Sequence, residues 1–210
     1  MNITDLLQSQ LSGNVLETLS KQIGGANPQQ TQVATSGIMN ILLGAMAKNA
    51  ATPEGASALS NALDRDHDGS VLDDVMGMFT GQAKPASEKA LNGEAILGHV
   101  LGNRKDSAAK TISQVSGLDT SQVGSLMVQL APVIMGALGK TKKENNMNPS
   151  DLSGMLGGIL GNMKGGNQAK MDPKMAMLTA FLDKDGDGSI VDDVAGMGMS
   201  FLGRLFGKKR

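Results

Sequence analysis

The chain has 210 residues, enough for one large or two small domains, and its formal net charge is −1 at pH 7. It has no Cys, which excludes disulfides, thiolate metal sites and cysteine nucleophiles. It has no Trp or Tyr and only 4 Phe, which disfavours base stacking and hence nucleic-acid binding, and leaves 15 Met and the aliphatic residues to fill a core.

The N-terminal segment, residues 1–7, lacks the basic stretch followed by an apolar run that marks a signal peptide. No stretch approaches the roughly 18 uninterrupted apolar residues of a membrane span. We therefore expect a cytoplasmic protein.

A helical unit is predicted to occur twice, in copies 92 residues apart. Asn27 and Asp119 each stand at the N-cap position of a long helix with regularly spaced apolar residues, and Pro132 is expected to kink the second of these helices. The matching residues are Gln22, Gly25, Gln30, Gly44, Ala45 and Lys48 in one copy and Gln114, Gly117, Gln122, Gly136, Ala137 and Lys140 in the other.

Two acidic segments, residues 64–74 and 183–193, are near-copies of each other and have the pattern of calcium loops. Carboxylates at positions 1, 3 and 5 converge on a hard cation, glycine at position 6 permits the tight turn, and residue 7 supplies its backbone carbonyl. The predicted ligands are Asp64, Asp66, Asp68, Ser70, Asp73 and Asp74 in the first loop and Asp183, Asp185, Asp187, Ser189, Asp192 and Asp193 in the second.

Position 12, a bidentate Glu in an EF-hand, is Val75 in the first loop and Val194 in the second. The closing ligand must therefore shift, to Asp74 and Asp193, with the preceding Asp as outer ligands or helix caps. The alternative is that both segments are Asp/Gly-rich turns without metal. Crowded carboxylates repel each other unless a cation neutralises them, so we favour about two bound Ca²⁺ ions over bare turns, and Ca²⁺ over Mg²⁺.

The second copy carries an insertion between its long helix and its acidic loop, at about residues 141–170. Its polar start and glycine-rich end are typical of a linker, although its Met-Leu-Ile centre is compatible with a short helix.

Residues 93–102, Gly-Glu-Ala-Ile-Leu-Gly-His-Val-Leu-Gly, open the second copy. With the double arrangement, they resemble the bacterial YidB-like families of unknown function over the chain up to about residue 140. The resemblance implies an all-helical bacterial intracellular fold and supplies no reaction. The acidic loops are similar to EF-hand or dockerin-type calcium loops.

The two histidines do not indicate an enzyme. We expect His67 to point to solvent from a non-ligand position of its loop, and His99 to be a buried, hydrogen-bonded helix residue. No nucleophile elbow or phosphate loop accompanies them. A metal-dependent enzyme using Asp73 and Asp74 is a distant alternative.

These patterns predict an all-α helical bundle of two related halves, each with an EF-hand-like acidic loop between helices. The predicted parts are a first repeat at 1–82, a linker at 83–92, a second repeat at 93–207 and a basic tail at 208–210. The expected function is non-enzymatic Ca²⁺ binding that stabilises the fold and its association with itself or a protein partner. The alternative is a calcium switch that exposes Met76, Met78, Met197 and Met199. The amphipathic, basic C-terminus is expected to pack on the body rather than on a membrane.

Overall fold

The computed structural model describes residues 3–11, 13–80, 88–164 and Phe181. Within these residues the chain is all helical, which confirms the predicted fold class, and the second acidic loop lies outside them. The α-helices are α1 (Ile3–Gln10), α2 (Asn14–Gln22), α3 (Pro28–Asn49), α4 (Pro53–Asp66), α5 (Val75–Thr80), α6 (Gly93–Leu101), α7 (Lys105–Ser116), α8 (Thr120–Glu144) and α9 (Pro149–Lys164). Short 3₁₀ turns are η1 (Ser70–Asp74), η2 (Glu88–Leu91) and η3 (Gly102–Arg104).

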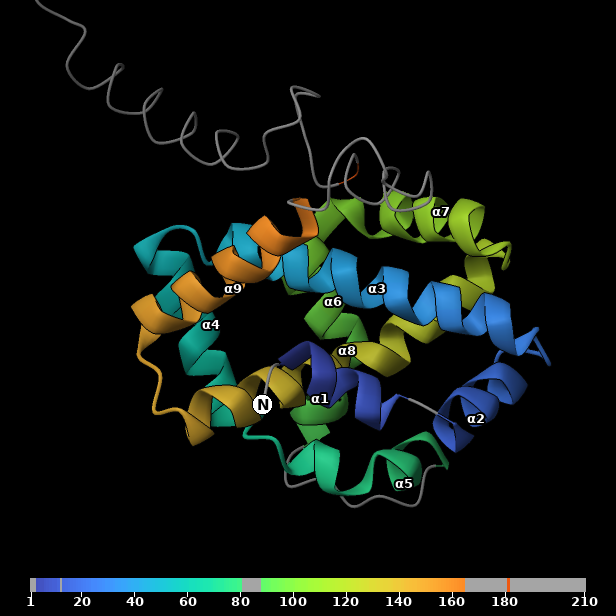
Figure 1. The fold of residues 1–210 in the computed structure, drawn as a ribbon, viewed down its shortest axis with the longest axis horizontal. Helices are drawn as coiled ribbons and strands as arrows, with labels where there is room; N and C mark the ends of the chain where they lie inside the picture. Colours follow the sequence, from blue (N-terminus) through green and yellow to red (C-terminus); the bar gives the residue numbers. More distant parts are fainter. Residues whose placement is uncertain (1–2, 12, 81–87, 165–180, 182–210) are drawn as a thin grey trace, which may run out of the picture.

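Two long helices, α3 and α8, run through the middle of the molecule, and the shorter helices pack around them (Figure 1). Both begin where the sequence predicts. The Asn27 side chain accepts a hydrogen bond from the Gln29 N–H at 2.8 Å, and the Asp119 N–H donates to the Gln122 side chain at 3.0 Å. These bonds satisfy backbone donors that a helix start leaves unpaired. Helix α8 passes through Pro132 without ending.

The core is one continuous cluster of Leu, Ile, Val, Ala and Met side chains drawn from both predicted halves. Met39, Met46, Met127 and Met135 are all buried in it. In the described part of the chain, Met thus fills space that aromatic residues occupy in other cores.

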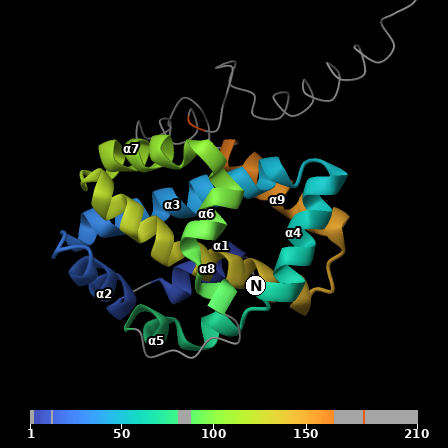
Figure 2. The same cartoon turned by 180° about the vertical axis from the view of Figure 1, so that it is seen from behind.

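Reciprocal contacts link the two long helices to the opposite half. Gln30, at the start of α3, donates to the Gly117 carbonyl at 3.0 Å, and Gln122, at the start of α8, donates to the Ile23 carbonyl at 2.8 Å. The order of two short helices and one long helix occurs as α1–α3 and again as α6–α8 (Figure 2). The duplication and the domain boundaries stay predictions, but the halves pack on one another rather than lying apart.

The predicted insertion contains a full helix, α9, where a mainly linker-like segment was expected. Asn148 caps it, accepting from the Ser150 and Asp151 N–H groups at 2.8 and 3.0 Å. Leu152, Leu156 and Leu160, spaced by four residues, are buried against the body. The glycines of the run, Gly154, Gly157, Gly158 and Gly161, lie on the exposed face of the helix.

Helix α8 is long and apolar enough, by length and composition alone, to cross a membrane. Of its most apolar window, 72% is buried inside the fold, as in the central helix of a bundle. It is the one such helix in the part of the chain that the structure describes.

Candidate functional site: the first acidic loop and the adjoining pocket

The first acidic loop begins later than the sequence pattern indicates. Helix α4 continues through Asp66, so Asp64 and Asp66 belong to its last turn. Asp68 lies between α4 and η1, and Ser70, Asp73 and Asp74 lie in η1. Successive residues of a helix point about 100° apart, so the side chains at positions 64 and 66 leave the helix in different directions.

The centre of the loop has the tight turn that a calcium loop needs. Gly69, at position 6, has φ 96° and ψ −6°, in the left-handed region. The Asp68 carboxylate folds back and accepts the Ser70 N–H at 3.0 Å. Hydrogen bonds from Ser70 lower the pKa of the Asp68 carboxyl below its ordinary value, and the charge of Lys143 adds to this effect.

The carboxylates of the α4 end are paired with cationic side chains of the protein. Asp64 accepts the Lys142 ammonium at 2.5 Å, and Asp66 contacts the Arg65 guanidinium at 2.8 Å. The Lys142 side chain is only 10% exposed, whereas that of Asp64 is 63% exposed. Lysines at the end of α8 thus supply positive charge beside the loop, where they also interact favourably with the helix dipole.

Among the described residues, no three His, Asp or Glu side chains gather closely enough to hold a metal ion. The structure therefore does not bring the first three predicted ligands together, because α4 is helical through Asp66. The side chain of Asp74 is not described, and the predicted ligands of the second loop lie outside the described residues. Metal binding by either loop stays a prediction.

The loop sits directly on the backbone of α8. A Cβ added to Gly139 would lie 1.6 Å from the His67 carbonyl oxygen, so only glycine permits this approach. One turn earlier, Gly136 faces Val71 and Leu72. Two glycines of α8 thus form the seat for the loop.

The two histidines are placed opposite to expectation. His67 is buried, with 6% of its surface exposed, and His99 is exposed on α6. The Nδ1 atom of His67 is buried and has no hydrogen-bond partner. Burial lowers the pKa of His67, and the nearby Asp66 charge offsets this in part. The backbone contact with Gly139 carries His67 inward, which its loop position in the sequence does not indicate.

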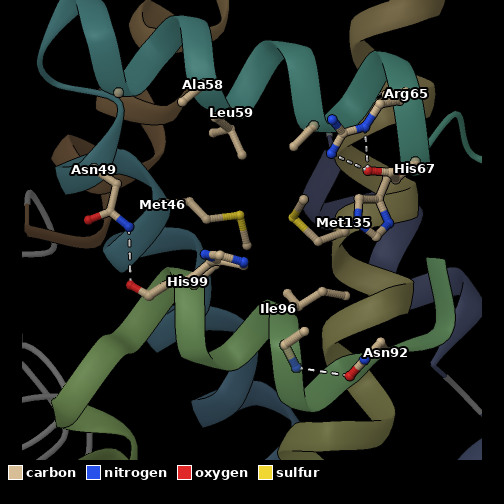
Figure 3. A pocket seen from close by; sticks show the side chains of 15 residues that line it. Met46, Asn49, Ala58, Leu59, Arg65, His67, Asn92, Ile96, His99 and Met135 are labelled. Atoms are coloured by element: carbon tan, nitrogen blue, oxygen red, sulfur yellow. Dashed lines mark hydrogen bonds and ion pairs between the residues drawn. The ribbon is translucent and has the colours of Figure 1, made fainter. Parts of the chain in front are cut away.

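Both histidines line one pocket of about 710 Å³. Helices α4 and α6 form its walls, and Met46 of α3 and Met135 of α8 point into it from the floor (Figure 3). Arg65 lies at the same end as His67 (Figure 3), and Asp66, which also lines the pocket, contacts Arg65 there. Sequence reasoning missed this pocket, although Gly55, Ala58 and Ala62 give α4 a face of small side chains at helical spacing.

The family model described as bacterial protein of unknown function (DUF937) matches residues 5–141. The chain belongs to this family. The predicted membership of a bacterial family of unknown function, extending to about residue 140, is confirmed, whereas the YidB-like resemblance stays a prediction. Comparison with curated proteins and with solved structures gave no match.

The DUF937 match covers the first acidic loop, the glycine seat on α8 and every residue that lines the pocket. It leaves out α9 and the second acidic loop. The loop and the pocket therefore lie within the family segment of this chain, and the second loop lies beyond it.

Proposed function

We propose that this protein is a non-enzymatic Ca²⁺-binding protein, in which about two ions, one at each acidic loop, stabilise the helical fold and its association with itself or a partner. The observation that supports this best is the turn at Gly69, with the Asp68 carboxylate folded over the Ser70 N–H. Asp73 is exposed in the following η1 turn, which leaves its carboxylate accessible to an ion.

To bind at the first loop, Ca²⁺ would have to replace Lys142 and Arg65 as the cationic partners of Asp64 and Asp66. For Asp64 and Asp66 to reach an ion bound at Asp68, the last turn of α4 must unwind and the pairs with Lys142 and Arg65 must open. Ion pairs with an exposed member contribute about 1 kcal/mol or less. Ca²⁺ present at about one hundred times its dissociation constant adds about 2.7 kcal/mol per site, which is enough to favour the exchange.

The second proposal, a calcium-responsive switch, rests on the position of α5, which begins directly after the loop at Val75 and carries Met76 and Met78. A change in the loop would be passed to α5 without an intervening linker. Met197 and Met199 lie outside the described residues. A cytoplasmic location and the YidB-like relationship complete the proposal, and a metal-dependent enzyme is the least supported alternative.

The first experiment is a calorimetric titration of the full, chelator-stripped chain with Ca²⁺ in excess Mg²⁺. We expect two binding events of micromolar or tighter affinity, and Asp68→Ala and Asp187→Ala should each remove one. Glu54→Ala, which removes an exposed acid in the first turn of α4, should keep both. Absence of heat, or two unchanged events in the double variant, would show that the loops are turns neutralised by protein side chains. A change of radius in X-ray scattering on adding Ca²⁺ would favour the switch over simple stabilisation.

A further inference from the structure

The pocket between α4 and α6 has mainly apolar walls. Leu59, Ile96 and Val100 line its sides, and the thioethers of Met46 and Met135 line its floor (Figure 3). The flexible, polarisable side chain of Met adapts to apolar molecules of different shapes. A volume of about 710 Å³ falls within the range of about 300–1,000 Å³ that holds small organic ligands in proteins, and far exceeds the space that a metal ion needs.

Small side chains keep the pocket open. Ala58 on α4 and Ala95 on α6 are exposed, and both line the space between the two helices. Helix α4 packs instead on α8 and α9, and α6 on α3 and α8. Larger residues at these alanine positions would fill the space, so the small side chains leave an opening that a tightly packed bundle would lack.

A buried polar atom stands without a partner at one end of the pocket. The Nδ1 atom of His67 makes no hydrogen bond, although more than nine-tenths of the residue surface is buried. A buried, unpaired polar group costs about 1–3 kcal/mol. Because Nδ1 has almost no accessible surface, the imidazole must turn toward the pocket for a ligand with one hydrogen-bonding group at this end to pair with it, while the remaining part of the ligand contacts the apolar walls.

The charges at this end balance. Arg65 and Asp66 form an ion pair at 2.8 Å, so their charges cancel at this end of the pocket. His99 is exposed, away from this end. A ligand with a net charge would have to give up its hydration without a counter-charge in return.

We propose that this pocket binds a neutral, mostly apolar small molecule whose single hydrogen-bonding group pairs with His67. The pocket shares Asp66 with the proposed calcium loop, so its test uses chelator-stripped protein, and its failure and that of calcium binding are distinguishable.

The probe is 1-octanol, a neutral molecule with one hydroxyl and an apolar chain, titrated into the full chain with ¹³C-methyl-labelled Met. We expect saturable shifts of the Met46 and Met135 methyl signals, each assigned by its Met→Leu variant. Octanoate and octyltrimethylammonium, which share the chain length but carry opposite charges, should bind at least tenfold more weakly. Equal binding by either charged analogue, or shifts that do not saturate, would overturn the proposal.

Variants locate the binding. Ala58→Phe fills the pocket and should weaken 1-octanol binding at least tenfold, and Ala95→Phe should do the same from the opposite wall. Ser57→Phe adds the same bulk at an exposed neighbouring position that does not line the pocket, and should leave binding unchanged. His67→Leu keeps the apolar volume but removes the hydrogen bond, and should weaken binding about tenfold. With folding checked by circular dichroism, unchanged binding in folded Ala58→Phe and Ala95→Phe would contradict this location.

Discussion

Some glycines in this protein are required by close contacts, whereas others have open space around them. Gly139 has the His67 carbonyl against its Cα, where an added Cβ would lie at 1.6 Å. Gly69 combines a positive φ with an approach to Lys140, whose Cβ would lie 2.7 Å from the new atom. Gly158, on the exposed face of α9, has nothing within 4 Å of an added Cβ. Gly139 and Gly69 allow the loop to pack closely on α8, whereas Gly158 makes no contact that requires glycine.

Alanine at these positions should therefore change stability in opposite directions. Gly139→Ala forces the loop away from α8 and should lower the free energy of unfolding by about 1–3 kcal/mol or more. Gly158→Ala, in a helix with open space, should raise it by about 0.5–1 kcal/mol. Urea unfolding followed by circular dichroism measures both. A Gly139→Ala variant as stable as the parent would contradict the described contact between loop and helix.

Sequence predicts the role of Gly69, because Asp and Gly at fixed loop positions define the turn locally. It does not predict that of Gly139, whose requirement comes from a residue 72 positions away. The predicted positions of the two histidines were wrong for the same reason. His67 is polar and lies in a loop, yet its contact with α8 buries it, while His99 lies among apolar neighbours in the sequence yet is exposed and lines the pocket.

Helix starts are the elements that sequence predicts best, since Asn27 and Asp119 act on their own first turns. Helix ends are less local. Helix α4 runs through Asp66 where a metal loop was expected, and its last turn carries the pair between Asp64 and Lys142. Lys142 lies on α8, so the sequence of the loop alone does not reveal that this lysine competes with a metal ion for Asp64. In α9, glycines suggested a linker, although the leucines at every fourth position already had helical spacing.

The pair between α4 and α8 gives a prediction at this scale. Asp64→Asn leaves the nearly buried Lys142 ammonium without its carboxylate and, because Asp64 is 63% exposed, should destabilise the protein by about 0.5–1 kcal/mol. Adding Lys142→Met, which keeps the chain length and removes the charge, should recover most of the loss. A double-mutant cycle on thermal unfolding measures the coupling. A coupling near zero would mean that the exposed side of Asp64 makes the pair unimportant.

At the scale of the whole molecule, the two predicted halves share one core and are linked by hydrogen bonds from Gln30 and Gln122. The all-α class and the two long helices can be predicted from the hydrophobic periodicity and the internal repeat. The packing of the two predicted halves on each other cannot, because it depends on which helix surfaces contact one another. The pocket belongs to the same category, since four helices contribute its lining.

We expect the helical body to unfold in one cooperative transition, with equal calorimetric and van't Hoff enthalpies. Gln30→Leu and Gln122→Leu should each cost about 0.5–1.5 kcal/mol and leave the transition single. Differential scanning calorimetry of the full chain measures both quantities. Two resolved transitions within the helical body would show that the halves fold as independent units.

Helix α8 also bears on how the chain is made. Before folding, it offers the cell a segment that meets the length and apolarity of a membrane anchor. The helices that pack on it most extensively, α1, α3, α4, α6 and α7, all precede it in the chain. They are synthesised before α8, and N-terminal parts fold first during synthesis. The order of the helices along the chain therefore supplies the packing partners of α8 before α8 can be captured by the membrane-insertion machinery.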